Sequence, residues 1–290
     1  MIMSSNQTIS LEEIHSLQRK SIQYRKTILS LIFSAKAGHT GGSLSCVDIL
    51  NILYNKVMNI SPKNFSEIDR DHYVHSKGHS VEALYAVLVD KGFYSLEELN
   101  TIEKFGSPFI GHPTRSIPGI EQNTGALGHG LSLSVGMALA SKLDGRNNRV
   151  FTIMGDGELT EGSIWEASAS ASNYKLDNLV AIVDRNTLQI SGRTENVMAM
   201  EPLEDKFAAF GYAVRHVDGN NVRDLSNLLL NLPFEKEKPN LVLAHTTKGK
   251  GISFMEDNVA WHHRVPTNEE YALALQELEA SDKALESMNG

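Results

Sequence analysis

The sequence predicts an α/β protein with a mostly parallel sheet and helices on both faces, and two observations support this. Short apolar, β-rich runs recur at residues 150–154, 179–183, 212–217 and 241–244. Segments with helical character, most of them longer, alternate with these runs. Continuous apolar runs are typical of strands buried on both faces, and alternation of strands with helices is typical of parallel sheets.

The helices are predicted from their start signals and from apolar spacing. Ser10 followed by Glu13 forms a capping box, and apolar residues then recur at helical spacing up to Gly38. Similar signals predict helices near 95–105 and 267–286, and a helix rich in small residues is expected over 162–172. No linker interrupts the chain. We therefore expect residues 1–290 to form one domain with an N-terminal helical extension and a C-terminal helical tail.

Composition narrows the class of protein. The chain has 290 residues, 41% of them apolar, and a formal charge of -8, which favours a globular protein and argues against nucleic-acid binding. Apolar runs such as 179–183 are too short to cross a membrane. Cys46 is the only cysteine, so we expect a buried core residue and no intramolecular disulfide. The start of the chain lacks a secretory signal pattern, which favours a cytoplasmic location.

Polar residues follow two of the predicted strands. Gly155-Asp156-Gly157 comes after the first and Asp184-Arg185-Asn186 after the next, with a helix between. Because neighbouring parallel strands end at one edge of a sheet, Asp156 and Asn186 are expected to meet there. A carboxylate and an amide oxygen suit Mg²⁺, which readily shares its ligands with phosphate oxygens. Gly-Asp-Gly alone would indicate only a turn.

This spacing, Gly155-Asp156-Gly157, then 28 residues, then Asn186, resembles the signature of thiamine diphosphate enzymes. The resemblance implies thiamine diphosphate as cofactor, with Mg²⁺ or a substituting Ca²⁺ or Mn²⁺. It implies that Asp156, Asn186 and the backbone carbonyl of Leu188 hold the metal. Gly157 would lie against the diphosphate.

Further segments resemble the transketolase family in particular. Residues 36–43 match the segment whose histidine, His39, touches the sugar donor. Residues 76–79 match the segment whose histidine, His79, contacts the diphosphate. His112 matches a histidine beside the substrate. The loop along the cofactor's rings is matched by residues 124–130, and its cofactor-binding members would be Gly125, Ala126 and Leu127.

Residues 261–266 resemble the segment that supplies the last active-site histidine. We assign His262 to that role, in contact with both cofactor and substrate, and His263 is the competing choice. The resemblance implies transfer of a two-carbon ketol unit from a ketose to an aldose. In that reaction His39 and His262 would stabilise oxygen charge and move protons, while His112 would position donor hydroxyls.

The family's catalytic glutamate belongs to a pyrimidine-binding domain that this sequence does not contain. The expected partner is therefore a C-terminal transketolase subunit, in an α2β2 assembly. Glu161 and Glu166 match interface glutamates of the family. Pentose phosphates are the default substrates, and a sulfonated or branched sugar remains open. His129, Thr187 and Ser191 depart from the residues usual in the family and leave the substrate range unassigned.

Four other interpretations compete with parts of this one. A deoxyxylulose-phosphate synthase would share the cofactor signature, and a silent scaffold subunit would bind cofactor without reacting. His72, His75 and His79 could be zinc ligands, but a strand-like Tyr73-Val74 spoils a common face. Residues 248–251 only superficially resemble a phosphate loop, so we expect a flexible loop flanking the site.

Overall fold

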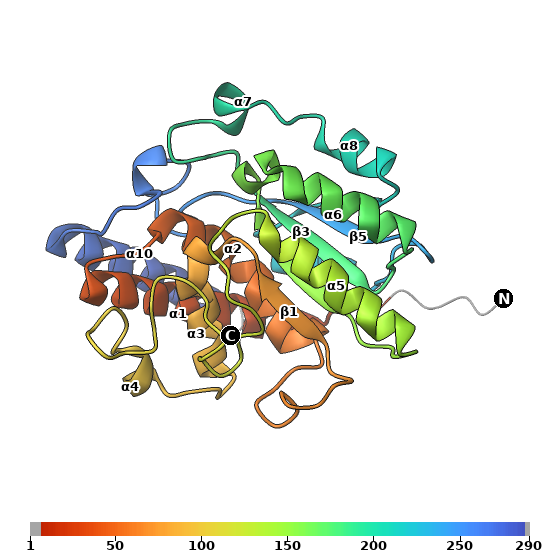
Figure 1. Cartoon of the computed structure of the whole chain (residues 1–290). Coiled ribbons are helices and arrows are strands. Elements are labelled where there is room, and N and C mark those ends of the chain that lie inside the picture. Colours follow the sequence, from red (N-terminus) through yellow and green to blue (C-terminus); the bar gives the residue numbers. More distant parts are fainter. Residues whose placement is uncertain (1–6, 288–290) are drawn as a thin grey trace.

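The structure, a computed structural model, describes residues 7–287 and is built on one five-stranded sheet. All its strands run parallel, in the order β1-β2-β3-β5-β4 (Figure 1). The four predicted strands are confirmed within a residue or two. The strands are β1 (His72–His75), β2 (Val150–Gly155), β3 (Leu179–Arg185), β4 (Ala213–Asp218) and β5 (Asn240–His245).

The remaining strand, β1, was not among the predicted strands of the sheet, although its central residues Tyr73-Val74 were described as strand-like. It is only four residues long and has a histidine at each end, so it shows neither a continuous apolar run nor clear alternation. It pairs with β2 from His72 opposite Val150 to His75 opposite Ile153. This edge position brings the segment after His75 to the same end of the sheet as the segment after β2.

Helices cover both faces of the sheet, as predicted (Figure 1). One core contains Phe151 and Ile153 of β2 and packs against α1, α2, α3, α9 and α10; the other contains Val150 and Met154 and packs against α5, α6 and α8. Alternate residues of one strand thus serve opposite layers. The helices are α1 (Leu11–Ala35), α2 (Thr40–Ile52), α3 (Val81–Asp90), α4 (Leu96–Leu99), α5 (His129–Leu143), α6 (Gly162–Asn173), α7 (Thr194–Val197), α8 (Leu203–Ala209), α9 (Val222–Leu229) and α10 (Asn268–Ser287).

Both ends of the described chain belong to one helical layer. The capping box of α1 is present, since Ser10 and Glu13 exchange hydrogen bonds with each other's backbone. Ile28 and Leu29 of α1 are fully buried. Helix α10 lies along α1, where the Gln23 amide donates to Asp282 at 3.1 Å. Residues 7–287 contain no helix long and apolar enough to cross a bilayer.

The helix predicted near 95–105 is wrong in its length. The capping box of Ser95 and Glu98 is present, but α4 ends at Leu99. Beyond it Glu103 adopts a left-handed φ of 59°, and Phe105 is fully exposed. A capping box marks where a helix starts, but no buried apolar stripe continues here to sustain further turns.

Candidate active site

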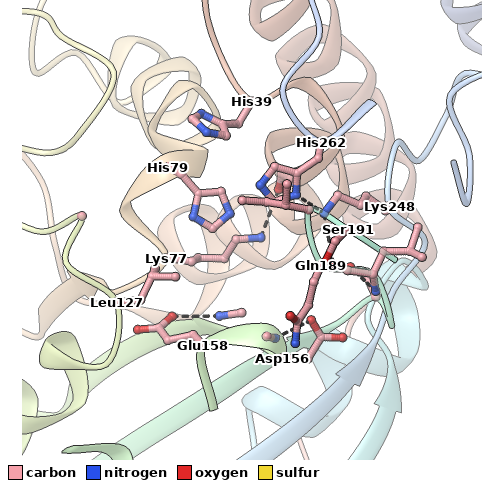
Figure 2. Close-up of a pocket in the computed structure, with 17 residues that line it drawn as sticks. His39, Lys77, His79, Leu127, Asp156, Glu158, Gln189, Ser191, Lys248 and His262 are labelled. Atoms are coloured by element: carbon pink, nitrogen blue, oxygen red, sulfur yellow. Dashed lines mark hydrogen bonds between the residues drawn. The ribbon is translucent and has the colours of Figure 1, made fainter. Parts of the chain in front are cut away.

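A cavity of about 390 Å³ opens at the carboxyl ends of the strands, where ligands usually bind in open parallel sheets. Figure 2 shows histidines and lysines on one side of it and the carboxylates of Asp156 and Glu158 on the other. The predicted site residues that line it are His39, His79, Gly125, Leu127, Asp156, Gly157, Asn186, Leu188 and His262. Unpredicted ones include Lys77, Glu158, Gln189 and Lys248.

Asp156 and Asn186 come together because β2 and β3 are neighbours. Gly155 lies opposite Asp184 in the parallel register, so the residues that follow leave the sheet at one edge. The carboxylate of Asp156 accepts hydrogen bonds from the backbone nitrogen of Thr187 at 2.6 Å and from Arg185 at 3.0 Å. Burial raises the pKa of Asp156, an effect that Arg185 opposes. A positive partner or ion is therefore favourable beside this carboxylate.

The oxygens predicted to hold a metal share this edge. The side-chain oxygen of Asn186 accepts from the backbone nitrogen of Leu188 at 3.1 Å. The carbonyl of Leu188 accepts from the ammonium of Lys248 at 3.1 Å, so it already faces a cation. Residues 7–287 hold no cluster of three His, Cys, Asp or Glu side chains suited to a metal. A carboxylate, an amide and a backbone carbonyl instead fit a hard cation such as Mg²⁺.

Lys77 supplies a buried positive charge that was not predicted as part of the site. Its ammonium forms an ion pair with Asp184, and both side chains are almost completely buried. It also donates to the carbonyl of Gly42 at 3.1 Å. Burial alone would lower the pKa of Lys77, but the charge and hydrogen bond of Asp184, together with other nearby acidic groups, raise it. The group therefore stays protonated and presents a fixed positive charge to the cavity.

The predicted histidines converge from four separate segments. The ring of His39 lies 5.2 Å from that of His79, 5.7 Å from that of His262 and 6.3 Å from that of His112, measured between centroids. The first and last of these segments are tied together, since the side-chain hydroxyl of Thr40 donates to the carbonyl of Arg264 at 2.7 Å. Of the four, His112 does not line the cavity itself.

Three of these histidines, His39, His79 and His262, are held neutral near pH 7. Burial lowers the pKa of His39 to about 4 and that of His262 to about 3, with neighbouring cationic groups adding to the effect. Burial and Lys77 also lower the pKa of His79. A neutral imidazole has one nitrogen that donates and one that accepts, which suits contact with sugar hydroxyls.

His262 and His263 occupy different environments. The Nδ1 atom of His262 lies 2.7 Å from the ammonium of Lys248. Because an ammonium can only donate, Nδ1 accepts and the ring proton lies on Nε2. His263 is exposed and does not line the cavity, although its ring is 4.6 Å from that of His39. This geometry favours His262 as the site residue.

The loop predicted to lie along the cofactor is packed tightly behind the histidines. Gly125 has a φ of 137°, and a Cβ there would come within 2.6 Å of the ring of His112. Gly125 and Leu127 line the cavity, whereas Ala126 is exposed and does not. Glu158 holds the end of this loop by accepting from the backbone nitrogen of Gly128 at 2.9 Å.

The remaining residues singled out in the sequence fall in several environments. Lys248 is only 2% exposed, so the expectation of a flexible loop is wrong, although the segment does border the site. Cys46 is fully buried, as expected. His75 bonds to Tyr73 and Ser80, outside any shared site with His79. Glu161 and Glu166 lie outside the cavity, exposed on and next to α6.

Comparisons with known proteins agree with this geometry. Residues 18–281 match the family model described as "Transketolase, thiamine diphosphate binding domain". The chain is 48% identical to one subunit of the apulose-4-phosphate transketolase of Phocaeicola vulgatus, over 96% of this chain and 99% of that protein. It is 42% identical to a 6-deoxy-6-sulfo-D-fructose transketolase subunit of a Clostridium species, over 92% and 98% of the two chains.

Solved structures match as well. The transketolase of Campylobacter jejuni superposes with a TM-score of 0.82 at 26% identity, covering 96% of this chain and 48% of that one. A Pichia stipitis transketolase complex with sedoheptulose 7-phosphate gives a TM-score of 0.80 at 26% identity, covering 94% and 46%. The chain thus spans about half the length of these transketolases. The matches in sequence and in fold establish that this chain belongs to the transketolase family and carries its thiamine diphosphate-binding domain.

Proposed function

We propose that this chain is the cofactor-binding subunit of a two-subunit transketolase, and that residues 1–290 form one domain for that purpose. One observation supports this most: the sheet edge that carries Asp156 and Asn186 and a cluster of neutral histidines line the same cavity. Relatives named as transketolase subunits match over nearly their whole length. A cytoplasmic location fits the single, buried thiol.

Each part of the cavity has a proposed role toward the cofactor. Asp156, Asn186 and the carbonyl of Leu188 would hold Mg²⁺, while Gly157, His79 and Lys248 would face the diphosphate. Gly125, Ala126 and Leu127 would lie along the rings. Thiamine diphosphate, when bound, supplies the carbon nucleophile and the electron sink for carbon–carbon cleavage.

The histidines would act on the sugar. His39 and His262 are neutral, so each can donate to a developing alkoxide or accept a proton from a hydroxyl. The Nε2–H of His262 is directed by the lysine at its other nitrogen. His112, beside Gly125 at the rim, is suited to positioning donor hydroxyls.

The proposed partner is a second subunit with a pyrimidine-binding domain and its catalytic glutamate, in an α2β2 assembly. Two relatives are named as one of the subunits of a transketolase, which supports a separate second chain. Glu161, at the start of α6, and Glu166, within α6, are both exposed and leave this face open to a partner. They are the proposed interface residues.

Apulose 4-phosphate is the proposed donor. Two relatives, at 48% and 44% identity, are named apulose-4-phosphate transketolase subunits, which favours that sugar over ordinary pentose phosphates. The sulfonated sugar 6-deoxy-6-sulfo-D-fructose is the second candidate, because the relative named for it is 42% identical.

Coexpression with the product of the neighbouring gene tests the proposal. The purified complex would be loaded with thiamine diphosphate and Mg²⁺ and assayed for ketol transfer from apulose 4-phosphate, 6-deoxy-6-sulfo-D-fructose and xylulose 5-phosphate. We expect turnover by the complex and none by this chain alone. Carbon dioxide release from pyruvate would instead indicate a deoxyxylulose-phosphate synthase. Bound cofactor without turnover of any donor would favour a scaffold role.

A further inference from the structure

The carboxylate of Glu82 is buried beneath the histidine cluster, outside the cavity lining. Glu82 is the second residue of α3 and is 2% exposed. One of its oxygens accepts from the backbone nitrogen of His39 at 3.3 Å, and the other accepts from the hydroxyl of Ser43 at 2.8 Å. Helix α2 begins here without a side-chain cap of its own. Glu82 therefore provides, from another helix, the negative charge that a helix N-terminus favours.

The backbone just before His39 also packs on this carboxylate. Gly38 has a φ of 140°, and a Cβ at that position would lie 2.6 Å from an oxygen of Glu82. The carboxylate thus contacts the chain on both sides of the His39 Cα. Neither the φ nor the clearance at Gly38 would tolerate a larger residue.

Glu82 also connects two parts of the site. It follows His79 by three residues, on a helical run that starts at Gly78 and continues into α3. The segment that carries His39 is therefore tied directly to the segment that carries Lys77 and His79. We propose that Glu82 is a positioning residue that sets His39 against His79, a role that rests on the proposed function of His39 in ketol transfer.

The charge of Glu82 matters for this role. An apolar side chain could fill the same volume without the cost of burying a carboxylate, but it could accept neither bond. Burial raises the pKa of Glu82 to about 7, with Glu103 adding to the rise and the bonds from Ser43 and His39 opposing it. Around it, the residue before α2 is the neutral His39, α3 presents Tyr85, and the segment after α4 presents Glu103.

Ionisation of Glu82 therefore controls how firmly His39 is held. The ionised carboxylate accepts both bonds, whereas protonation of the oxygen that faces His39 turns this oxygen into a donor and removes the bond from the backbone nitrogen. Ionisation of Glu82 has the opposite effect on the stability of the fold: it helps to hold His39 but destabilises the folded chain. Because the folded pKa is raised, burial of this group costs nothing below the unfolded pKa and becomes a cost as pH rises to about 7. Activity should thus require a form of the residue that the fold does not favour.

The first test uses the assembled two-subunit enzyme. In Glu82→Gln we expect kcat at pH 8 to fall about tenfold to a hundredfold, the range for small misplacements near a reacting centre, with KM for the donor within about twofold. The fall in wild-type kcat below about pH 7 should disappear. The matched control is Glu103→Gln, which removes the neighbouring charge. It should leave kcat at pH 8 unchanged and move the acid limb to lower pH.

The second test does not depend on activity. Hydrogen exchange of the segment 38–43 in this chain should speed up about tenfold in Glu82→Gln at pH 8, while exchange in β2 and β3 stays unchanged. Glu82→Met provides a second variant of similar volume. If the wild-type complex has no transketolase activity, the proposed function fails while the exchange result still decides the role of Glu82. Unchanged exchange at 38–43 in both variants would overturn the inference, as would an unaltered kcat and pH profile in an active complex.

Discussion

The two ends of the sheet use charge in different ways. At the amino end, Arg149 forms an ion pair with Asp71 at 2.6 Å, and Asp71 also accepts from the backbone nitrogen of Asn59 at 2.9 Å. Arg70 pairs with Glu121 beside it. At the carboxyl end, Lys77 and Asp184 pair in full burial next to Lys248 and a set of histidines.

The difference lies in what the charges face. At the amino end the carboxylates tie loops to strand starts, and their bonds are made within the chain. At the carboxyl end the lysines and histidines line an open cavity, and burial shifts the pKa values of His39, His262 and Lys248 downward. Such shifts concentrate at functional sites, because the fold holds groups there that a ligand, and not the chain, completes.

The largest expected effect tests whether the buried ion pair at the carboxyl end of the sheet matters more for stability than the partly exposed pair at the amino end. Lys77→Met leaves the carboxylate of Asp184 buried without its cation, and we expect a loss of about 3–5 kcal/mol in the free energy of unfolding. Urea unfolding of this chain measures it. Arg149→Met is the amino-end control and should cost clearly less, because Arg149 is 29% exposed and Asp71 keeps its backbone donors. Equal losses in the two variants would remove the distinction between the two ends.

The second effect concerns turnover. His262→Ala should lower kcat of the assembled enzyme by about 10²–10³-fold, because a positioned acid–base group is lost. His263→Ala is the neighbouring control and should change kcat by less than about tenfold, because its side chain is exposed outside the cavity lining. A larger loss in the His263 variant would reverse the assignment.

The third effect concerns cofactor affinity. Lys248→Met should weaken thiamine diphosphate binding to the complex by about 1.5–3 kcal/mol, the usual value of a hydrogen bond to a charged group. Isothermal titration calorimetry measures the change. Lys250→Met, two residues away, is the matched control: Lys250 is 38% exposed and pairs with Glu256 at 3.2 Å, so affinity should stay the same.

The smallest effect concerns pH. The pKa values of His39 and His262 are lowered to about 4 and 3, so below pH 6.5 the unfolded chain binds protons that the folded chain does not. Their contribution to stability is therefore lost as pH falls from 6.5 toward 4. The double variant His39→Gln/His262→Gln should lose less stability than wild type between pH 6.5 and 5. Thermal unfolding at several pH values in that range gives the pH dependence of the free energy of unfolding. From it, wild type should take up about one proton more on unfolding than the double variant, and not two, since both rings are partly solvent-screened.

The fold was largely predictable from local patterns. Apolar runs are visible without any knowledge of neighbours, so the strands that later proved to be β2, β3, β4 and β5 could be predicted. The parallel pairing of β2 and β3 then followed, and with it the meeting of Asp156 and Asn186. Strand β1 was not placed in the sheet, because its strand-like pair Tyr73-Val74 is too short a signal and pairing with β2 defines the strand.

The site was predictable only in part. Its histidines and metal-ligand candidates were predicted from the spacing of Gly155–Asn186 and from resemblance to a family. The roles of Lys77, Lys248 and Glu82 were not predicted. A charged residue can be recognised as buried only when its partner is known, and these partners are distant in the sequence. Lys77 and its partner Asp184 are 107 residues apart, and Glu82 is 43 residues from His39. Nothing in the local sequence distinguishes these residues from charges on a solvated surface.

The walls of the cavity come from both halves of the chain, with His39 near the start and His262 near the end. A ligand that fills it is therefore bound by the native state and not by the denatured ensemble. By mass action, a ligand at 100 times its Kd would add about 2.7 kcal/mol to apparent stability. A melting curve can thus screen candidate diphosphates and sugars before any turnover is measurable.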